Sequence, residues 1–253
     1  MNSKFRRMRK GDPDPVHLSP TDLGKCPAQI IKKKQPKKYP RKYSPELIEI
    51  LEAGNRLHVT TSIYRDGSKG LIDNEKHMKA ISLNEDVIFS GYADFIMIDE
   101  NGLYIEDLKT TKREAFFHFN KSPDSYSEKV QLSAYRWLYW IIFGVKIKRG
   151  IITKIDRIEP LNRISLKIDM FSIDRTEELI LNNPALLLLQ GKISQEEFEN
   201  KTLDFVLNNG NKWLCKYCDD RNTCKINRQR KIIEKKKKAE QKAKKEEFQK
   251  LLK

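Results

Sequence analysis

Two acidic residues and a lysine stand close enough in the sequence to form a hydrolytic metal site. Asp107 and Lys109 are two residues apart, so a strand at 105–109 places both side chains on one face. Asp94 lies on the preceding apolar segment. Mg²⁺ and Mn²⁺ take hard oxygen ligands, and a nearby cation can orient a water or stabilise a charged transition state. These three residues are therefore candidates for metal-dependent phosphodiester cleavage.

The elements that must bring these residues together are two strands joined by a turn. Residues 86–109 contain many β-forming side chains, interrupted by turn residues at 99–102. A loop at 100–101 places Asp94 opposite Asp107, whereas a loop at 101–102 places it opposite Lys109. In both registers the three groups lie within about 4.5–8 Å between Cβ atoms. A bulge at Gly102 would alter the pairing.

Three further polar residues could complete this site. His58 ends a helical segment that begins near 44–46. Gln131 and Tyr135 are one turn apart on a helix expected at 125–143, so they face the same way. A glutamine there can hydrogen-bond a lysine, a metal-bound water or a phosphate. The alternative is that each is an ordinary polar residue on a helix surface.

The four cysteines suggest a second, softer metal site. Cys215, Cys218 and Cys224 are close in the sequence, and Cys26 is far upstream. Four thiolates suit a 4Fe–4S cluster or Zn²⁺. A zinc ribbon usually has two close pairs, and only one pair with two intervening residues is present here. Four reduced cysteines without metal are the remaining alternative. A cluster would join both ends of the fold and close a very long loop.

The charge of the chain is concentrated at its ends. The 253 residues carry a net charge of +15, with +10 in residues 1–42 and +8 in residues 228–253, whereas the part between them is slightly acidic. Basic ends suit a polyanion, although a solubilising tail would have the same composition. We find neither a secretory signal nor a membrane-spanning stretch, and we expect a reducing cytoplasmic location and no membrane partner.

The remaining sequence predicts an α/β fold with a linear organisation. We expect a basic disordered N-terminus over 1–17, a folded domain over 18–226 and a Lys-rich helical or disordered tail over 227–253. Within the domain, Ser19 caps a short helix that begins at Pro20. The other expected elements are a linker at 32–42, strands at 150–157 and 163–171, and helices at 174–190 and 194–207.

The order of these motifs resembles a known family. The matching segments are Leu18–Thr21 before Cys26–Pro27, Gly54 to His58, Gly91–Asp94, Asp107–Thr110, Gln131 to Tyr135, and the three C-terminal cysteines. Together they are similar to the RecB-like branch of the PD-(D/E)xK nucleases, in the group that carries a 4Fe–4S cluster. That group includes CRISPR-adaptation exonucleases and phage-encoded relatives. The resemblance covers about residues 18–226.

The resemblance implies a fold, a site and an activity. The fold would be a restriction-endonuclease-like core, a mixed central sheet flanked by helices, closed at its ends by the cluster. His58, Asp94, Asp107 and the carbonyl of Leu108 would bind Mg²⁺ or Mn²⁺. The catalytic lysine would be Lys109. The remaining implied site residues are Gln131 and Tyr135 as supporting residues and Cys26, Cys215, Cys218 and Cys224 as cluster ligands.

The implied activity is DNA cleavage, as a single-stranded DNA exonuclease. The implied partners are DNA with free ends and proteins of a CRISPR-adaptation, recombination or phage replication system. Residues 65–70 and the basic tail have no counterpart in the family motifs. Two alternatives stay open, a non-catalytic DNA-binding or scaffolding protein that keeps the nuclease fold and a zinc-ribbon nucleic-acid protein.

Overall fold

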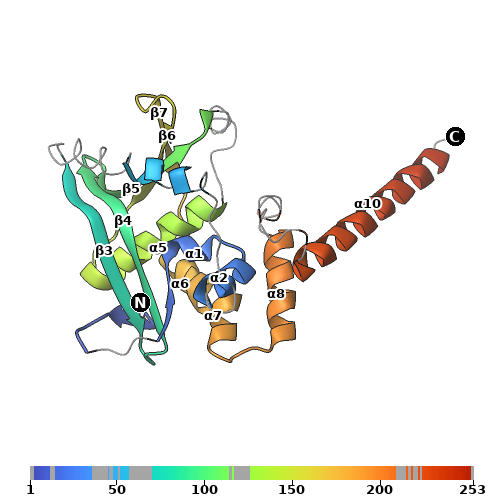
Figure 1. Ribbon diagram of the computed structural model, residues 1–253, viewed down its shortest axis with the longest axis horizontal. Coiled ribbons are helices and arrows are strands. Elements are labelled where there is room, and N and C mark those ends of the chain that lie inside the picture. Colours follow the sequence, from blue (N-terminus) through green and yellow to red (C-terminus); the bar gives the residue numbers. More distant parts are fainter. Residues whose placement is uncertain are drawn as a thin grey trace.

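The protein consists of a mixed β-sheet with helices packed mainly on one face (Figure 1). The computed structural model describes residues 3–11, 15–35, 45, 48–50, 52–56, 70–113, 116, 126–208, 215, 218, 222 and 224–251. Within these residues the structure confirms the expected mixed sheet flanked by helices. No helix in this part of the chain is long and apolar enough to cross a lipid bilayer.

Seven strands of the described chain form one sheet. Its path is β1 (Phe5–Arg7), β3 (Leu71–Ser82), β4 (Val87–Asp99), β5 (Gly102–Thr111), β6 (Arg149–Asp156) and β7 (Arg163–Ile168), and β2 (Val16–Leu18) also pairs with β4. The β5–β6 and β2–β4 pairs are parallel, and the other pairs are antiparallel. The centre of the sheet is therefore β4 and β5, the two strands expected to carry the acidic residues.

The main core lies between the sheet and α5 (Tyr126–Phe143). Trp137 on α5 is fully buried, and its ring packs edge-on against Phe5 of β1 and Phe89 of β4, with centroid separations of 4.9 and 5.6 Å. A smaller cluster of Phe95, Met97, Leu108 and Ile155 forms a second core. Burial of both clusters holds β4 and β5 rigidly in the interior.

The remaining helices extend from this core. They are α1 (Pro20–Leu23), α2 (Pro27–Lys34), α6 (Ile173–Leu181), α7 (Pro184–Leu189), α8 (Gln195–Asn208) and α10 (Lys225–Leu251). The described residues of 45–56 are also helical. Ser19 is the N-cap of α1, as expected. Figure 1 shows α10 projecting away from the body as a long arm.

One expected helix is divided in two. The sequence predicted a single helix over 174–190, but α6 ends at Leu181 and α7 begins at Pro184. Asn183 caps the second helix, because its Oδ1 accepts hydrogen bonds from the N–H groups of Ala185 and Leu186. Pro184 has no N–H and favours the first turn of a helix. The expected helices at 125–143 and 194–207 agree with α5 and α8 within one residue.

Two parts of the N-terminal segment that was expected to be disordered form strands. Residues 5–7 form β1 against β3, and residues 16–18 form β2 against β4. Phe5 is buried against Trp137. The Glu177 carboxylate accepts hydrogen bonds from Ser3 Oγ at 2.6 Å, from the Lys4 N–H at 2.7 Å and from Trp137 Nε1 at 3.1 Å. One apolar side chain and one shared carboxylate thus order a segment whose composition suggested disorder.

Candidate active site

The β4–β5 hairpin adopts the first of the two expected registers. Its paired residues run from Asp99–Gly102 to Phe95–Glu106, so Glu100 and Asn101 form the loop. The Asn101 N–H donates to Asp99 Oδ1 at 2.8 Å, and Gly102 has a φ of +97°, which favours glycine. This register places Asp94 across from Asp107.

The alternation of side chains between the two faces of β4 is interrupted next to Asp94. Ala93 and Ile96 both belong to the main core, although strict alternation would place them on opposite faces, and Phe95 belongs to the second cluster. The neighbouring β3 residue across from Asp94 is Glu75, whose φ of +48° lies in the left-handed region. Asp94 Oδ2 accepts the Leu108 N–H at 2.7 Å. A carboxylate therefore joins β4 to β5 beyond the last paired residues.

Asp107 is the centre of the site. It is 1% exposed, and its Oδ1 accepts a hydrogen bond from Gln131 Nε2 at 2.9 Å. Its Oδ2 forms an ion pair with Lys109 Nζ at 2.7 Å. Oδ2 is buried, and besides this ion pair it receives no hydrogen bond from the described residues. Gln131 also approaches the Tyr135 hydroxyl at 3.4 Å. The structure thus gathers Lys109, Gln131 and Tyr135 around Asp107.

The electrostatics of the site favour a bound cation. Burial, followed by the neighbouring Asp107 carboxylate, raises the pKa of Asp94 to about 7. Burial lowers the pKa of Lys109, but the carboxylates of Asp107, Asp94 and Glu128 together outweigh that effect, so the net pKa is raised and the ammonium stays charged. Burial, followed by Asp107, raises the pKa of Tyr135, whose hydroxyl stays protonated. Asp94 and Asp107 thus lie close together in a partly desolvated site, and a bound cation would stabilise both as carboxylates.

Two residues that sequence reasoning missed lie beside Lys109. Lys154 on β6 is the register partner of Lys109 and forms an ion pair with Glu128 of α5 at 2.9 Å. The Glu128 carboxylate also acts on Lys109 and raises its pKa. A signal was present, because Glu128, Gln131 and Tyr135 occupy positions i, i+3 and i+7 of one helix face. Lys154 had no comparable signal, since its position depends on a distant parallel pairing.

The expected metal ligands are only partly visible. His58 lies outside the described residues, and the role of the Leu108 carbonyl stays a prediction. Among the described residues, no three His, Cys, Asp or Glu side chains gather with the spacing of a metal site. Asp94 and Asp107 supply two carboxylates, and the buried Asp107 Oδ2 is a suitable ligand atom. This donor set fits a hard divalent ion.

The four cysteines come from opposite ends of the chain to one region. All four are free of disulfides. Burial raises the pKa of Cys26 to about 12, and the neighbouring Cys215 and Cys224 act in the same direction. Burial raises the pKa of Cys215, and the neighbouring Cys224 and Cys218 act in the same direction. Gln29 Nε2 lies 3.6 Å from Cys218 Sγ. The donor set therefore fits a soft metal centre, although the thiols are not at metal-ligand spacing.

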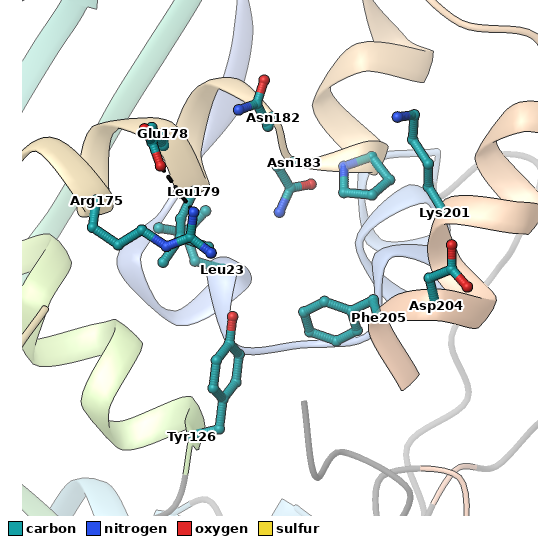
Figure 2. A pocket seen from close by; sticks show the side chains of 11 residues that line it. Leu23, Tyr126, Arg175, Glu178, Leu179, Asn182, Asn183, Lys201, Asp204 and Phe205 are labelled. Carbon is teal, nitrogen blue, oxygen red and sulfur yellow. Dashed lines mark hydrogen bonds and ion pairs between the residues drawn. The ribbon is translucent and has the colours of Figure 1, made fainter. Parts of the chain in front are cut away.

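A separate cleft lies between α6, α7 and α8. It has a volume of about 330 Å³ and includes the Tyr126 and Phe205 rings (Figure 2). Its charged lining consists of Arg175, Lys201, Glu178 and Asp204, of which Arg175 and Glu178 form an ion pair at 2.8 Å. None of the residues around Asp107 line it. Because its charges balance, the cleft does not favour a particular ligand.

This chain shares its fold with a protein of known structure. No protein-family model and no curated protein matches the chain. The chain is similar to a solved structure titled "Crystal structure of SSO0001", with a TM-score of 0.54 and 19% identity over 87% of this chain and 89% of that chain. At this identity the likeness establishes a common fold alone.

Weaker likenesses are found to two structures of an alkaline exonuclease (LHK-Exo) from Laribacter hongkongensis, one of them in complex with dAMP. Both have a TM-score of 0.46, with identities of 10% and 13%. They cover 75% and 74% of this chain and 94% of the other chain in each case.

Proposed function

We propose that this chain is a divalent-metal-dependent DNA nuclease that hydrolyses phosphodiester bonds of single-stranded DNA ends. The observation that carries the proposal is the convergence of Asp94 and Asp107 from neighbouring strands, with Lys109 and Gln131 held against Asp107. A buried acidic group of raised pKa, such as Asp94, next to a charged amine is costly for the fold and common at catalytic sites.

Each side chain has a distinct role in this proposal. Asp94 and Asp107 would hold Mg²⁺ or Mn²⁺, with His58 and the Leu108 carbonyl as further ligands. When bound, such an ion lowers the pKa of a coordinated water and neutralises the scissile phosphate. Lys109 would orient the attacking water or stabilise the negative charge that develops on the phosphate. Gln131 would fix the Asp107 carboxylate, and Tyr135 would support Gln131.

The test uses three variants of the full chain. Asp107→Ala and Lys109→Ala should each abolish Mn²⁺-dependent degradation of end-labelled single-stranded DNA, while circular dichroism still reports a folded protein. Lys148→Ala, at an exposed lysine outside the site, is the matched control and should cleave normally. Undiminished cleavage by both site variants would refute the assignment. Linear and circular substrates assayed together distinguish exonuclease from endonuclease action.

A non-catalytic DNA-binding role is the second candidate, and the projecting basic helix α10 favours it. Purified protein that binds DNA but does not cut it with Mg²⁺ or Mn²⁺ would support this role.

We further propose that Cys26, Cys215, Cys218 and Cys224 hold a structural 4Fe–4S cluster, with Zn²⁺ as the alternative. The proximity of Cys26 to Cys215 and Cys224 supports a shared centre. Elemental analysis of protein purified without oxygen would distinguish iron from zinc.

A further inference from the structure

A positively charged cavity lies at the edge of β3, away from the carboxylates. It has a volume of about 300 Å³, and its lining residues are Arg7, Met8, Lys76, His77, Lys79, Ile142 and Phe143. The β1 strand pairs with β3 only at 80–82. The cavity therefore opens where β1 leaves the sheet edge and the C-terminal end of α5 passes by.

The charge of this cavity indicates an anionic ligand. Among the described residues, its lining includes three basic side chains, Arg7, Lys76 and Lys79, and no acidic residue. Lys76 is paired with Asp73 at 2.5 Å. Within the described part of the chain, no ion pair neutralises Arg7 or Lys79. Since burial and the nearby Lys79 lower the pKa of His77, the positive charge comes from the lysines and the arginine.

One exposed aromatic ring, Phe143, lines the same cavity, and a second ring, Tyr92, lies next to it on the lining residue His77. The His77 ring stacks on Tyr92, with centroids 4.2 Å apart and planes at 9°, and Tyr92 is 58% exposed. Phe143 is 40% exposed, and Lys76 Nζ lies 5.6 Å from its ring centroid. Single-stranded nucleic acids bind where cations follow the backbone and aromatic rings stack on bases. A free phosphate or a small anion would not need these rings.

One helix face connects this cavity to the candidate active site. Gln131, Tyr135, Tyr139 and Phe143 follow at four-residue spacing along α5, which places them in one row. Gln131 bonds Asp107 at one end of the row, and Phe143 lines the cavity at the other. With a rise of 1.5 Å per residue, the ends are about 18 Å apart. A strand of a few nucleotides can cover that distance.

We propose that this cavity is a second binding subsite for single-stranded DNA, a few nucleotides from the bond that is cleaved. Arg7 and Lys79 bind backbone phosphates, and Tyr92 and Phe143 stack against bases. The proposal rests on the proposed nuclease function for its choice of DNA as the ligand. It assigns this edge of the sheet to holding the strand while the carboxylate site acts on it.

The test compares two double variants that remove the same charge. Arg7→Gln/Lys79→Gln changes the cavity, and Lys146→Gln/Lys167→Gln changes exposed lysines elsewhere. Affinity for labelled oligothymidylate is measured by fluorescence anisotropy in EDTA, which prevents cleavage, across a series of salt concentrations. Loss of two phosphate contacts should make the slope of log K against log salt shallower by about 1.4. The control slope should be that of the wild type.

A third variant tests the stacking. Tyr92→Ala should weaken oligothymidylate binding at least about fivefold, the lower end for the loss of one base–aromatic stack. Cleavage of a thymidine dinucleotide, which is too short to reach the cavity, should stay normal in every variant. Melting curves confirm that each variant is folded.

The outcomes separate this proposal from the function on which it rests. Equal slopes for the two double variants, or tight binding by Tyr92→Ala, would overturn the subsite even if wild-type protein degrades DNA. Equal competition by duplex DNA would overturn its assignment to single strands. If no variant or wild-type protein cleaves any DNA, but binding still depends on Arg7 and Lys79, the nuclease proposal fails and the subsite stands.

Discussion

Replacing Gly91 by alanine tests how tightly α1 and α5 close over the sheet at the candidate active site. A Cβ atom at Gly91 would lie 2.7 Å from Pro20 Cδ and 3.1 Å from Tyr135 Cε1. The proline ring cannot rotate away, and Tyr135 is 4% exposed. Overpacking of this kind costs about 1–3 kcal/mol. For a chain of this size the loss lowers Tm by about 2–12 °C.

The matched control is Gly54→Ala. Among the described residues, a Cβ at Gly54 would meet only Thr110 Oγ1, at an ordinary 3.5 Å, and Gly54 is helical. Alanine there should be neutral or stabilise by up to about 1 kcal/mol. Differential scanning fluorimetry of both variants measures the two shifts. A Gly91→Ala protein that melts as high as Gly54→Ala would refute the close packing of Pro20 and Tyr135 on β4.

Three other predictions concern charge and metal. In EDTA, Asp94→Asn should be more stable than the wild type at pH 8, by up to about 4 kcal/mol. The pKa of Asp94 is raised from its ordinary 3.8 to about 7 in the folded protein. The protonated carboxyl therefore stabilises the fold fully below pH 3.8, and this stabilisation is lost as the pH rises through 7. Urea titrations at several pH values test this, and a difference between the two proteins that stays constant with pH would contradict it. Deletion of 228–253, which removes a net +8, should weaken DNA binding mainly at low salt. Equal affinity at all salt concentrations would give the tail another role. Cys26→Ser should lower both the bound iron and Tm, and unchanged metal content would remove Cys26 from the proposed cluster.

The sequence predicted the two central strands because their signals are local. Apolar residues of β4 and β5 flank a turn, so only the register stayed open between two loops. The register is decided by Gly102, which can adopt a positive φ as the first residue of β5. The row of Gln131 and Tyr135 was also predictable, since helical spacing places both on one face.

The sequence did not predict features that depend on distant pairing. The β3 strand carries charged residues such as Asp73, Glu75 and Lys76, and its pairing with β4 outweighs their weak strand preference. Lys154 reaches the site only through the parallel pairing of β6 with β5. Such contacts depend on the folded topology, which periodicity within one segment does not report.

The shared carboxylate of Glu177 has a practical consequence for producing this protein. A fusion partner attached just before Ser3 would have to leave Phe5 free to enter the core. A chain that begins at residue 8 would lose two of the three hydrogen-bond donors to Glu177 and would expose the Trp137 ring. It would also leave β3 without its β1 partner at 80–82. Unpaired strand edges beside exposed apolar rings promote aggregation. Purification handles therefore belong away from the N-terminal strand.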